Sequence, residues 1–277
     1  MGGLRHGRRR VGLPVAALVV AFVVFASVAT TAAPASAATV ALRPPVVDRD
    51  APDPTVVRVD DTYYSFTTNV GLFGGIANVP VSRSSDLTNW TLIAEALPTL
   101  GSWAAVGFTW APSVTQIAGK WVLYYTALDA ASGRECIGVA LANQVIGPYV
   151  DSRGAPLVCQ LDHGGSIDPS PYRNAQGQWW LTWKSDDNAI GGTPGIWSQP
   201  LAANGQSLTG SPTVLLIADR AWETGIVEAP VFLDAANKLW LFYSAGPYAS
   251  VRYAAGYGVC AGPSGPCTKQ TIDGPWL

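Results

Sequence analysis

Aromatic and aliphatic residues recur in four short segments that have the pattern of β-strands. The segments are 63–66 (Tyr-Tyr-Ser-Phe), 121–125 (Trp-Val-Leu-Tyr-Tyr), 179–183 (Trp-Trp-Leu-Thr-Trp) and 239–243 (Leu-Trp-Leu-Phe-Tyr). Aromatic and β-branched residues favour pleated strands. A turn-forming stretch precedes each segment, so each is predicted to pair with the strand before it as a β-hairpin.

The four segments are almost evenly spaced. If Tyr63, Trp121, Trp179 and Leu239 are equivalent positions, the steps between them are 58, 58 and 60 residues. A fixed period of this size, with several short strands in each repeat, indicates the blades of a β-propeller. We therefore predict an all-β fold, which agrees with a composition of 29 Gly, 21 Pro and 10% aromatic residues.

The first 37 residues have a different pattern. An apolar run from Val15 to Val28 precedes the small-residue sequence Ala35-Ser36-Ala37 and follows a basic stretch that contains Arg5, Arg8, Arg9 and Arg10. The run of 14 residues is shorter than the roughly 18–20 residues that span a bilayer. We interpret residues 1–37 as a signal peptide and 38–277 as a secreted, extracellular catalytic domain without membrane contact. An uncleaved membrane anchor is the alternative.

Charge narrows the class of partner. Residues 38–277 contain 13 basic and 19 acidic residues, a net charge of −6. A mildly acidic chain without a basic stripe argues against nucleic acid as a partner and favours a neutral ligand.

The four cysteines indicate disulfide bonds, because their number is even and an exported chain enters an oxidising compartment. Three pairings are possible, and we expect the two local ones, Cys136–Cys159 and Cys260–Cys267. Zinc is the competing interpretation. It is disfavoured because the chain has no Cys-x-x-Cys and only one histidine, His163, after residue 37.

Carboxylates recur beside prolines at the start of the repeats. Asp53 and Asp168 directly precede their prolines, and Glu228 lies two residues before its own; the prolines are Pro54, Pro112, Pro169 and Pro230. Because the first strand of each blade lines the central channel, equivalent positions converge on one pocket. Repulsion within an acidic cluster falls when one member takes up a proton, so the cluster suits acid/base chemistry or a cation. Ordinary Asp-Pro turn chemistry is the alternative.

The motifs resemble those of family 43 glycoside hydrolases. They are Ala51-Pro52-Asp53-Pro54, Ser85-Asp86-Leu87-Thr88-Asn89-Trp90, Trp110-Ala111-Pro112, Ser166-Ile167-Asp168-Pro169 and Val227-Glu228-Ala229-Pro230. The resemblance implies a five-bladed propeller that hydrolyses arabinose- or xylose-containing plant polysaccharides or oligosaccharides with inversion at the anomeric carbon. It also implies that Asp53 is the general base, Glu228 the general acid, and Asp168 the residue that orients the acid and raises its pKa. Inverting hydrolysis needs one protonated carboxyl group and one carboxylate about 6.5–9.5 Å apart.

Two further residues are candidate sugar contacts. Trp110 can offer its ring face to a sugar, with packing between blades as the alternative. His163 lies five residues before Asp168 and can bond a sugar hydroxyl, with loop capping as the alternative.

The chain departs from the family pattern after the fourth repeat. Only 34 residues follow Tyr243, fewer than another repeat needs. We therefore expect about four blades, with the fifth missing through truncation or another form of closure. In relatives the fifth blade carries a histidine near a central metal, often calcium, and no residue here takes that part. We expect no cofactor for the chemistry and no metal ligands, and a structural calcium near the channel stays an open alternative.

A carbohydrate-binding propeller without turnover is the main rival function. A sialidase is a weaker one, because the turn at Ser84–Trp90 is similar to an aspartate box but occurs once. Nor do the arginines share a blade position at which they could pair with a carboxylated sugar. The absence of Gly-x-Ser-x-Gly argues against a serine hydrolase.

Overall fold

The structure is a computed structural model that describes residues 1–3, 46–72 and 74–277. The chain divides into two units, Met1–Arg43 and Pro44–Leu277, and every described strand belongs to the second. Apart from residues 1–3, the predicted signal peptide lies outside the described residues. Among those residues, no helix has the length and apolar character needed to cross a membrane.

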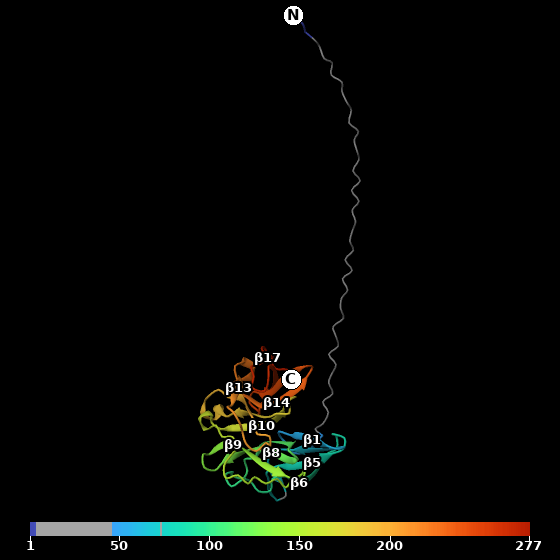
Figure 1. Ribbon diagram of the computed structural model, residues 1–277, viewed down its shortest axis with the longest axis vertical. Coiled ribbons are helices and arrows are strands. Elements are labelled where there is room, and N and C mark those ends of the chain that lie inside the picture. The colour runs from blue at the N-terminus through green and yellow to red at the C-terminus, as the bar shows by residue number, and fades with distance from the viewer. Residues whose placement is uncertain (4–45, 73) are drawn as a thin grey trace. The chain divides into compact units, whose positions relative to one another are not determined.

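Four antiparallel sheets follow one another along the second unit (Figure 1). The first contains β1 (Thr55–Val59), β2 (Thr62–Phe66), β5 (Pro80–Ser84) and β6 (Thr91–Glu95). The second contains β7 (Trp110–Ile117), β8 (Lys120–Asp129) and β9 (Arg134–Ala142). The third contains β10 (Ser166–Arg173), β11 (Trp179–Ser185), β12 (Gly195–Pro200) and β13 (Thr213–Ile217), and the fourth contains β14 (Val227–Ala235), β15 (Lys238–Ala245), β16 (Ala254–Cys260) and β17 (Cys267–Lys269).

The remaining elements are short connections. They are the hairpin of β3 (Val70–Leu72) and β4 (Gly75–Ala77), and the 3₁₀ helices η1 (Leu161–His163), η2 (Asp187–Ile190) and η3 (Ala221–Glu223). The all-β prediction is thus confirmed, and so is the arrangement in four blades. The motif at Ser84–Trp90 forms the turn between β5 and β6, where Asp86 accepts hydrogen bonds from the backbone N–H groups of Thr88 and Asn89.

The repeat found in the sequence corresponds to one strand of each blade. Tyr63, Trp121, Trp179 and Leu239 lie in the second strands β2, β8, β11 and β15. The first strands lie side by side in chain order, with β1 against β7, β7 against β10, and β10 against β14. The first strands therefore form the inner wall on which the predicted carboxylates are placed.

A repeated aromatic arrangement builds part of the core. The indole of Trp103 stacks on the ring of Tyr125 with 6.0 Å between centroids, and Trp222 stacks on Tyr243 at 6.1 Å. Each tyrosine hydroxyl donates to a buried acid, Tyr125 to Asp151 at 2.6 Å and Tyr243 to Glu223 at 2.8 Å. Further donors complete the partners of the two acids, because Lys269 Nζ lies 2.6 Å from Glu223 and the indole N–H of Trp103 donates to Asp151 at 3.1 Å.

Two disulfide bonds are present. Cys136–Cys159 joins β9 to the loop before η1, and Cys260–Cys267 joins β16 to β17. The predicted local pairing is confirmed. The residues after β17 complete the fourth blade, because Trp276 packs against Phe242 and its N–H donates to the carbonyl of Ala255.

Glycine at position 138 is required by the stack in the second blade. Gly138 faces Tyr125 across the sheet, and a Cβ there would lie 2.5 Å from Cζ of that tyrosine and 2.8 Å from Trp103. We expect Gly138→Ala to lower the free energy of unfolding by about 1–3 kcal/mol, the usual cost of overpacking. Urea unfolding would measure it, with Gly154→Ala as the control because a Cβ at Gly154 meets nothing within 4 Å. Equal stabilities of the two variants would contradict this packing argument.

Candidate active site

A backbone kink recurs on the inner strand of every blade. The residue before each proline has a positive φ: 49° at Asp53, 43° at Ala111, 57° at Asp168 and 50° at Ala229. On β7, β10 and β14 the strand register shifts at this kink, as in a β-bulge. Left-handed conformations of residues other than glycine cost about 1–3 kcal/mol each, so other contacts must maintain them.

Those contacts come from the preceding blade. The N–H of Ala111 donates to Thr68 Oγ1 at 2.9 Å, and the N–H of Asp168 donates to Thr126 Oγ1 at 3.1 Å. The N–H of Ala229 donates to Asp168 Oδ2 at 2.9 Å. Because the next residue is a proline without an N–H, the kink leaves no second donor unsatisfied. The kinks of successive blades are therefore linked around the channel.

The kinks bring the three predicted carboxylates into one pocket. Asp53, Asp168 and Glu228 line a cavity of about 880 Å³, together with the prolines of all four repeats. Trp110 also lines this cavity. The exposed ring of Phe108 lies against the ring of Trp110, with 6.5 Å between the two centroids. Acids from the first, third and fourth blades thus share a single site.

Each carboxylate has a different set of partners. Asp53 is exposed, and its Oδ2 accepts a hydrogen bond of 2.7 Å from Thr68. Glu228 lies 3.3 Å from Nζ of Lys184, and the same ammonium group lies 3.2 Å from Asp186. The Lys184 side chain is only 3% exposed, and the two carboxylates offset the free-energy cost of burying its ammonium group.

The electrostatics of the cluster favour a bound proton. The pKa of Asp168 is raised to about 7, first by burial and second by the charge of Glu228, while Lys184 and the N–H of Ala229 act in the opposite direction. The resemblance to the family assigned Asp168 the part of raising the pKa of Glu228. In the structure the elevated pKa is that of Asp168 itself. The pair therefore keeps a proton up to near neutral pH.

Several pocket residues were not assigned from the sequence. Lys184 directly follows the aromatic segment 179–183. Its partner Glu228 lies in the next blade, so the pairing could not be read from the repeat. Tyr253 lies in the loop before β16, and burial, followed by the charge of Glu228, raises its pKa above the ordinary tyrosine value. Tyr248, which is 84% exposed, lines the cavity from the same loop. This loop has no counterpart at a fixed repeat position, so periodicity carries no signal for it.

His163 is not among the described residues that line this cavity. Its Nδ1 lies 2.9 Å from Asp187 Oδ1, and its ring lies against Trp197 with 5.0 Å between centroids. These contacts join η1 to η2 and fit the loop-capping alternative. A sugar contact by His163 stays a prediction.

In residues 1–3, 46–72 and 74–277, no three His, Cys, Asp or Glu side chains are grouped so that they could hold a metal ion. The structural calcium near the channel stays an open alternative, because backbone carbonyls and water also bind this ion.

The fold and the site together define a β-propeller with a carboxylate cluster at the start of its inner strands. The sequence profile named Glycosyl hydrolases family 43 matches residues 42–276, and the chain belongs to this family.

Relatives within the family differ in the substrates that their names give. The chain is 26% identical over 221 residues to the extracellular exo-α-(1→5)-L-arabinofuranosidase of Cellvibrio japonicus (strain Ueda107). The aligned region covers 71% of this chain and 59% of the relative. It is 26% identical over 222 residues to the xylan 1,3-β-xylosidase of a Vibrio species, covering 75% and 38% of the two chains. This chain thus spans less than two thirds of both relatives.

A solved structure of a thermostable family-43 glycoside hydrolase shares the fold. Its TM-score is 0.69 at 24% identity, with 80% of this chain and 73% of that chain covered.

The raised pKa of Asp168 predicts a pH-dependent stability. Between pH 4 and 7 the folded state binds this proton more tightly than the unfolded state, whose aspartate has an ordinary pKa, so wild-type stability falls as pH rises through this range. Asp168→Asn removes the effect and leaves an oxygen to accept from the N–H of Ala229. We expect the melting temperature of this variant, relative to that of wild type, to increase by several degrees between pH 4 and 8.

Thermal unfolding of Asp168→Asn and wild type at a series of pH values measures this difference. Asp273→Asn, which removes an exposed carboxylate outside the pocket, is the control. A constant difference between Asp168→Asn and wild type across the series would rule out a proton held at Asp168.

Proposed function

We propose that this protein is a secreted glycoside hydrolase that cleaves arabinose- or xylose-containing plant polysaccharides or oligosaccharides with inversion at the anomeric carbon. The observation that supports this most directly is the meeting of Asp53, Asp168 and Glu228, from three blades, in one cavity. Family membership and the names of the arabinofuranosidase and xylosidase relatives support the substrate class.

Asp53 is assigned the part of general base. Thr68 holds its Oδ2, which fixes the carboxylate and leaves Oδ1 for a water molecule. The carboxylate takes a proton from this water as the water oxygen bonds to the anomeric carbon. The exposure of Asp53 allows water to reach it directly.

Glu228 is assigned the part of general acid. It gives its proton to the glycosidic oxygen as the bond from that oxygen to the anomeric carbon breaks, so both products leave with a hydroxyl group. Nζ of Lys184 lies 3.3 Å from Oε2 of the acid and limits its rotation.

Asp168 is assigned a positioning part. Its Oδ2 accepts from the N–H of Ala229, the residue directly after Glu228, and so fixes the backbone that carries the acid. Its raised pKa keeps a proton within the pair up to near neutral pH. Both effects act on the acid without contact between Asp168 and the bond that breaks.

A carbohydrate-binding propeller without turnover is the second candidate. The exposure of Asp53 and Tyr248 favours it, because an open cavity stays wet and polar interactions with a transition state are weaker in water. The two candidate functions differ in turnover, because the hydrolase releases product and the binding protein does not.

The activity that remains without the acid should depend on the leaving group of the substrate, whereas the activity that remains without the base should not. Glu228→Ala removes proton donation, which an oligosaccharide leaving group needs and a nitrophenolate hardly needs. We expect kcat/KM of Glu228→Ala to fall about 10²–10⁴-fold on xylo- or arabino-oligosaccharides but much less on 2,4-dinitrophenyl glycosides of the same sugars. Asp53→Ala should lose activity by a similar factor on both substrate types.

Steady-state kinetics of wild type and the two variants provide this comparison. Equal, very slow release of the chromophore by wild type and both variants would refute hydrolysis and favour the binding protein. An equal loss on both leaving groups for Glu228→Ala would refute its assignment as the acid.

The stereochemistry of the product is a separate prediction. If Asp53 activates a water on the face opposite the leaving group, the first product formed has the anomeric configuration opposite to that of the substrate. Proton NMR of a fresh reaction mixture, recorded before the anomers equilibrate, distinguishes the two. Retention of configuration would exclude Asp53 as a base.

A further inference from the structure

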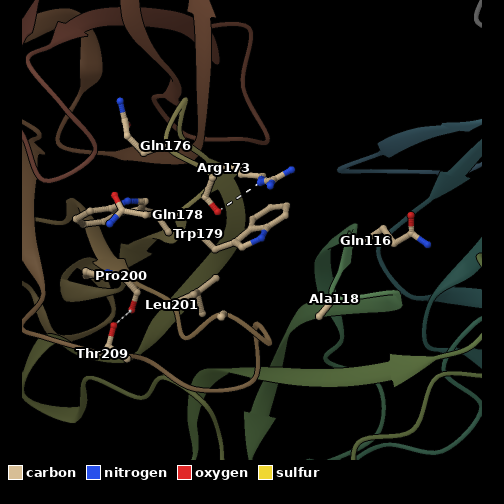
Figure 2. A pocket seen from close by; sticks show the side chains of 12 residues that line it. Gln116, Ala118, Arg173, Gln176, Gln178, Trp179, Pro200, Leu201 and Thr209 are labelled. Carbon is tan, nitrogen blue, oxygen red and sulfur yellow. Dashed lines mark hydrogen bonds between the residues drawn. The ribbon is translucent and has the colours of Figure 1, made fainter.

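A second cavity, of about 540 Å³, lies between the second and third blades. Gln116 and Ala118 line it from the end of β7 and the turn that follows. Arg173 and Trp179 line it from the hairpin that joins β10 to β11. Figure 2 shows the two groups facing one another across the cavity, with the residues of the third blade on one side and Gln116 and Ala118 on the other.

This cavity is separate from the carboxylate pocket. No residue in the described part of the chain lines both of them. Asp168 and Arg173 lie in the same strand, β10, five residues apart, which is about 16 Å at the rise of an extended strand. The two cavities therefore lie at opposite ends of the inner strands.

The side chains around the second cavity suit a neutral, hydroxyl-rich ligand. The indole of Trp179 is half-buried, and the guanidinium carbon of Arg173 lies 5.9 Å from its ring centroid. Gln116 and Gln176 expose amide groups that can both donate and accept hydrogen bonds, and Gln178, whose Oε1 accepts from Asn174 at 2.9 Å, can donate through its Nε2. An aromatic face beside several amides matches a sugar ring, which has an apolar C–H face and a rim of hydroxyl groups.

The same cavity lacks the groups for chemistry or for binding an anion. No carboxylate is among the described residues that line it. Arg173 is the one cation among the described lining residues; it lies over Trp179 and donates to the carbonyl of Gly177 at 3.4 Å. A phosphate or carboxylate ligand would find no second cation there.

The first blade provides an internal comparison. Arg58 faces Tyr63 in the same register as Arg173 faces Trp179, and its guanidinium carbon lies 5.7 Å from the tyrosine ring centroid. Neither Arg58 nor Tyr63 lines the second cavity. The cation and aromatic pair thus occurs in the first and the third blade, whereas the glutamines and the cavity lie at the junction of the second and third blades.

We propose that the cavity around Trp179 is a second saccharide-binding site, which holds a segment of a neutral pentose polymer without cleaving it. The choice of a pentose polymer rests on the proposed function, because the same chain would supply both sites. A polymer held there stays close to the carboxylate pocket between cleavage events.

Affinity gel electrophoresis tests the proposal with the full chain. Native gels contain soluble arabinan or arabinoxylan, and every protein carries Asp53→Ala so that the polymer stays intact. We expect Trp179→Ala to weaken the retardation constant about three- to tenfold on at least one polymer. The double variant Gln116→Ala/Gln178→Ala should weaken it in the same direction, and because both glutamines are exposed it should not disturb folding.

Tyr63→Ala is the matched control, because it removes the aromatic member of the equivalent pair outside the cavity. It should retain the retardation of the parent. Thermal unfolding of every variant checks folding, and the double glutamine variant decides the outcome if Trp179→Ala does not fold.

The proposal is overturned if the parent is not retarded by either polymer. It is also overturned if the glutamine variant binds like the parent, or if Tyr63→Ala loses as much binding as Trp179→Ala. This measurement does not depend on turnover. Failure of the hydrolase assignment would appear separately, as absence of chromophore release by wild type.

Discussion

The left-handed residue before each inner-strand proline is the constraint on which the site depends. Alone, this conformation is unfavourable, and a residue before proline ordinarily takes an extended conformation. It persists at Ala111, Asp168 and Ala229 because the N–H that leaves the sheet donates to a side chain of the preceding blade. The contact between blades and the orientation of the site are therefore produced by the same hydrogen bonds. In the last of these bonds the acceptor is Asp168 itself, so an acid of the candidate site also maintains the adjoining blade.

Much of the fold could be predicted because it repeats. A step of 58–60 residues located the second strand of every blade, and the prolines located the inner strands and the three carboxylates. The rest depends on contacts that no period encodes. Lys184 reaches Glu228 from another blade, and Tyr253 reaches it from a loop. His163 was singled out by its closeness to Asp168 in sequence, yet its ring bonds to Asp187 because the turn at Gly164 and Gly165 separates it from the start of β10. Closeness in sequence is a weak guide where the chain reverses.

The carboxylate cluster is balanced by one buried cation. Three acids in one pocket repel one another, and burial adds to the cost of charging Asp168. Lys184 offsets part of this cost at Glu228 and Asp186, and a proton on the Asp168 and Glu228 pair offsets another part. The pocket thus combines a fixed positive charge with an exchangeable one. Acid/base chemistry needs the exchangeable charge, whereas the fixed charge offsets repulsion between the carboxylates of Glu228 and Asp186.

The two ends of the inner strands differ because their backbones differ. At the start, a bulge breaks the register and turns side chains toward the channel. At the end, the hairpins are in register, and one pair of positions recurs in all blades; it is occupied by Arg58 and Tyr63, Gln116 and Trp121, Arg173 and Trp179, and Asp234 and Leu239. Only in the third blade does this pair line a cavity with glutamines from both blades. The irregular ends of three blades therefore place a carboxylate in the channel cavity, whereas the regular ends of three blades carry an aromatic ring. The two proposed sites therefore use opposite ends of one repeated hairpin.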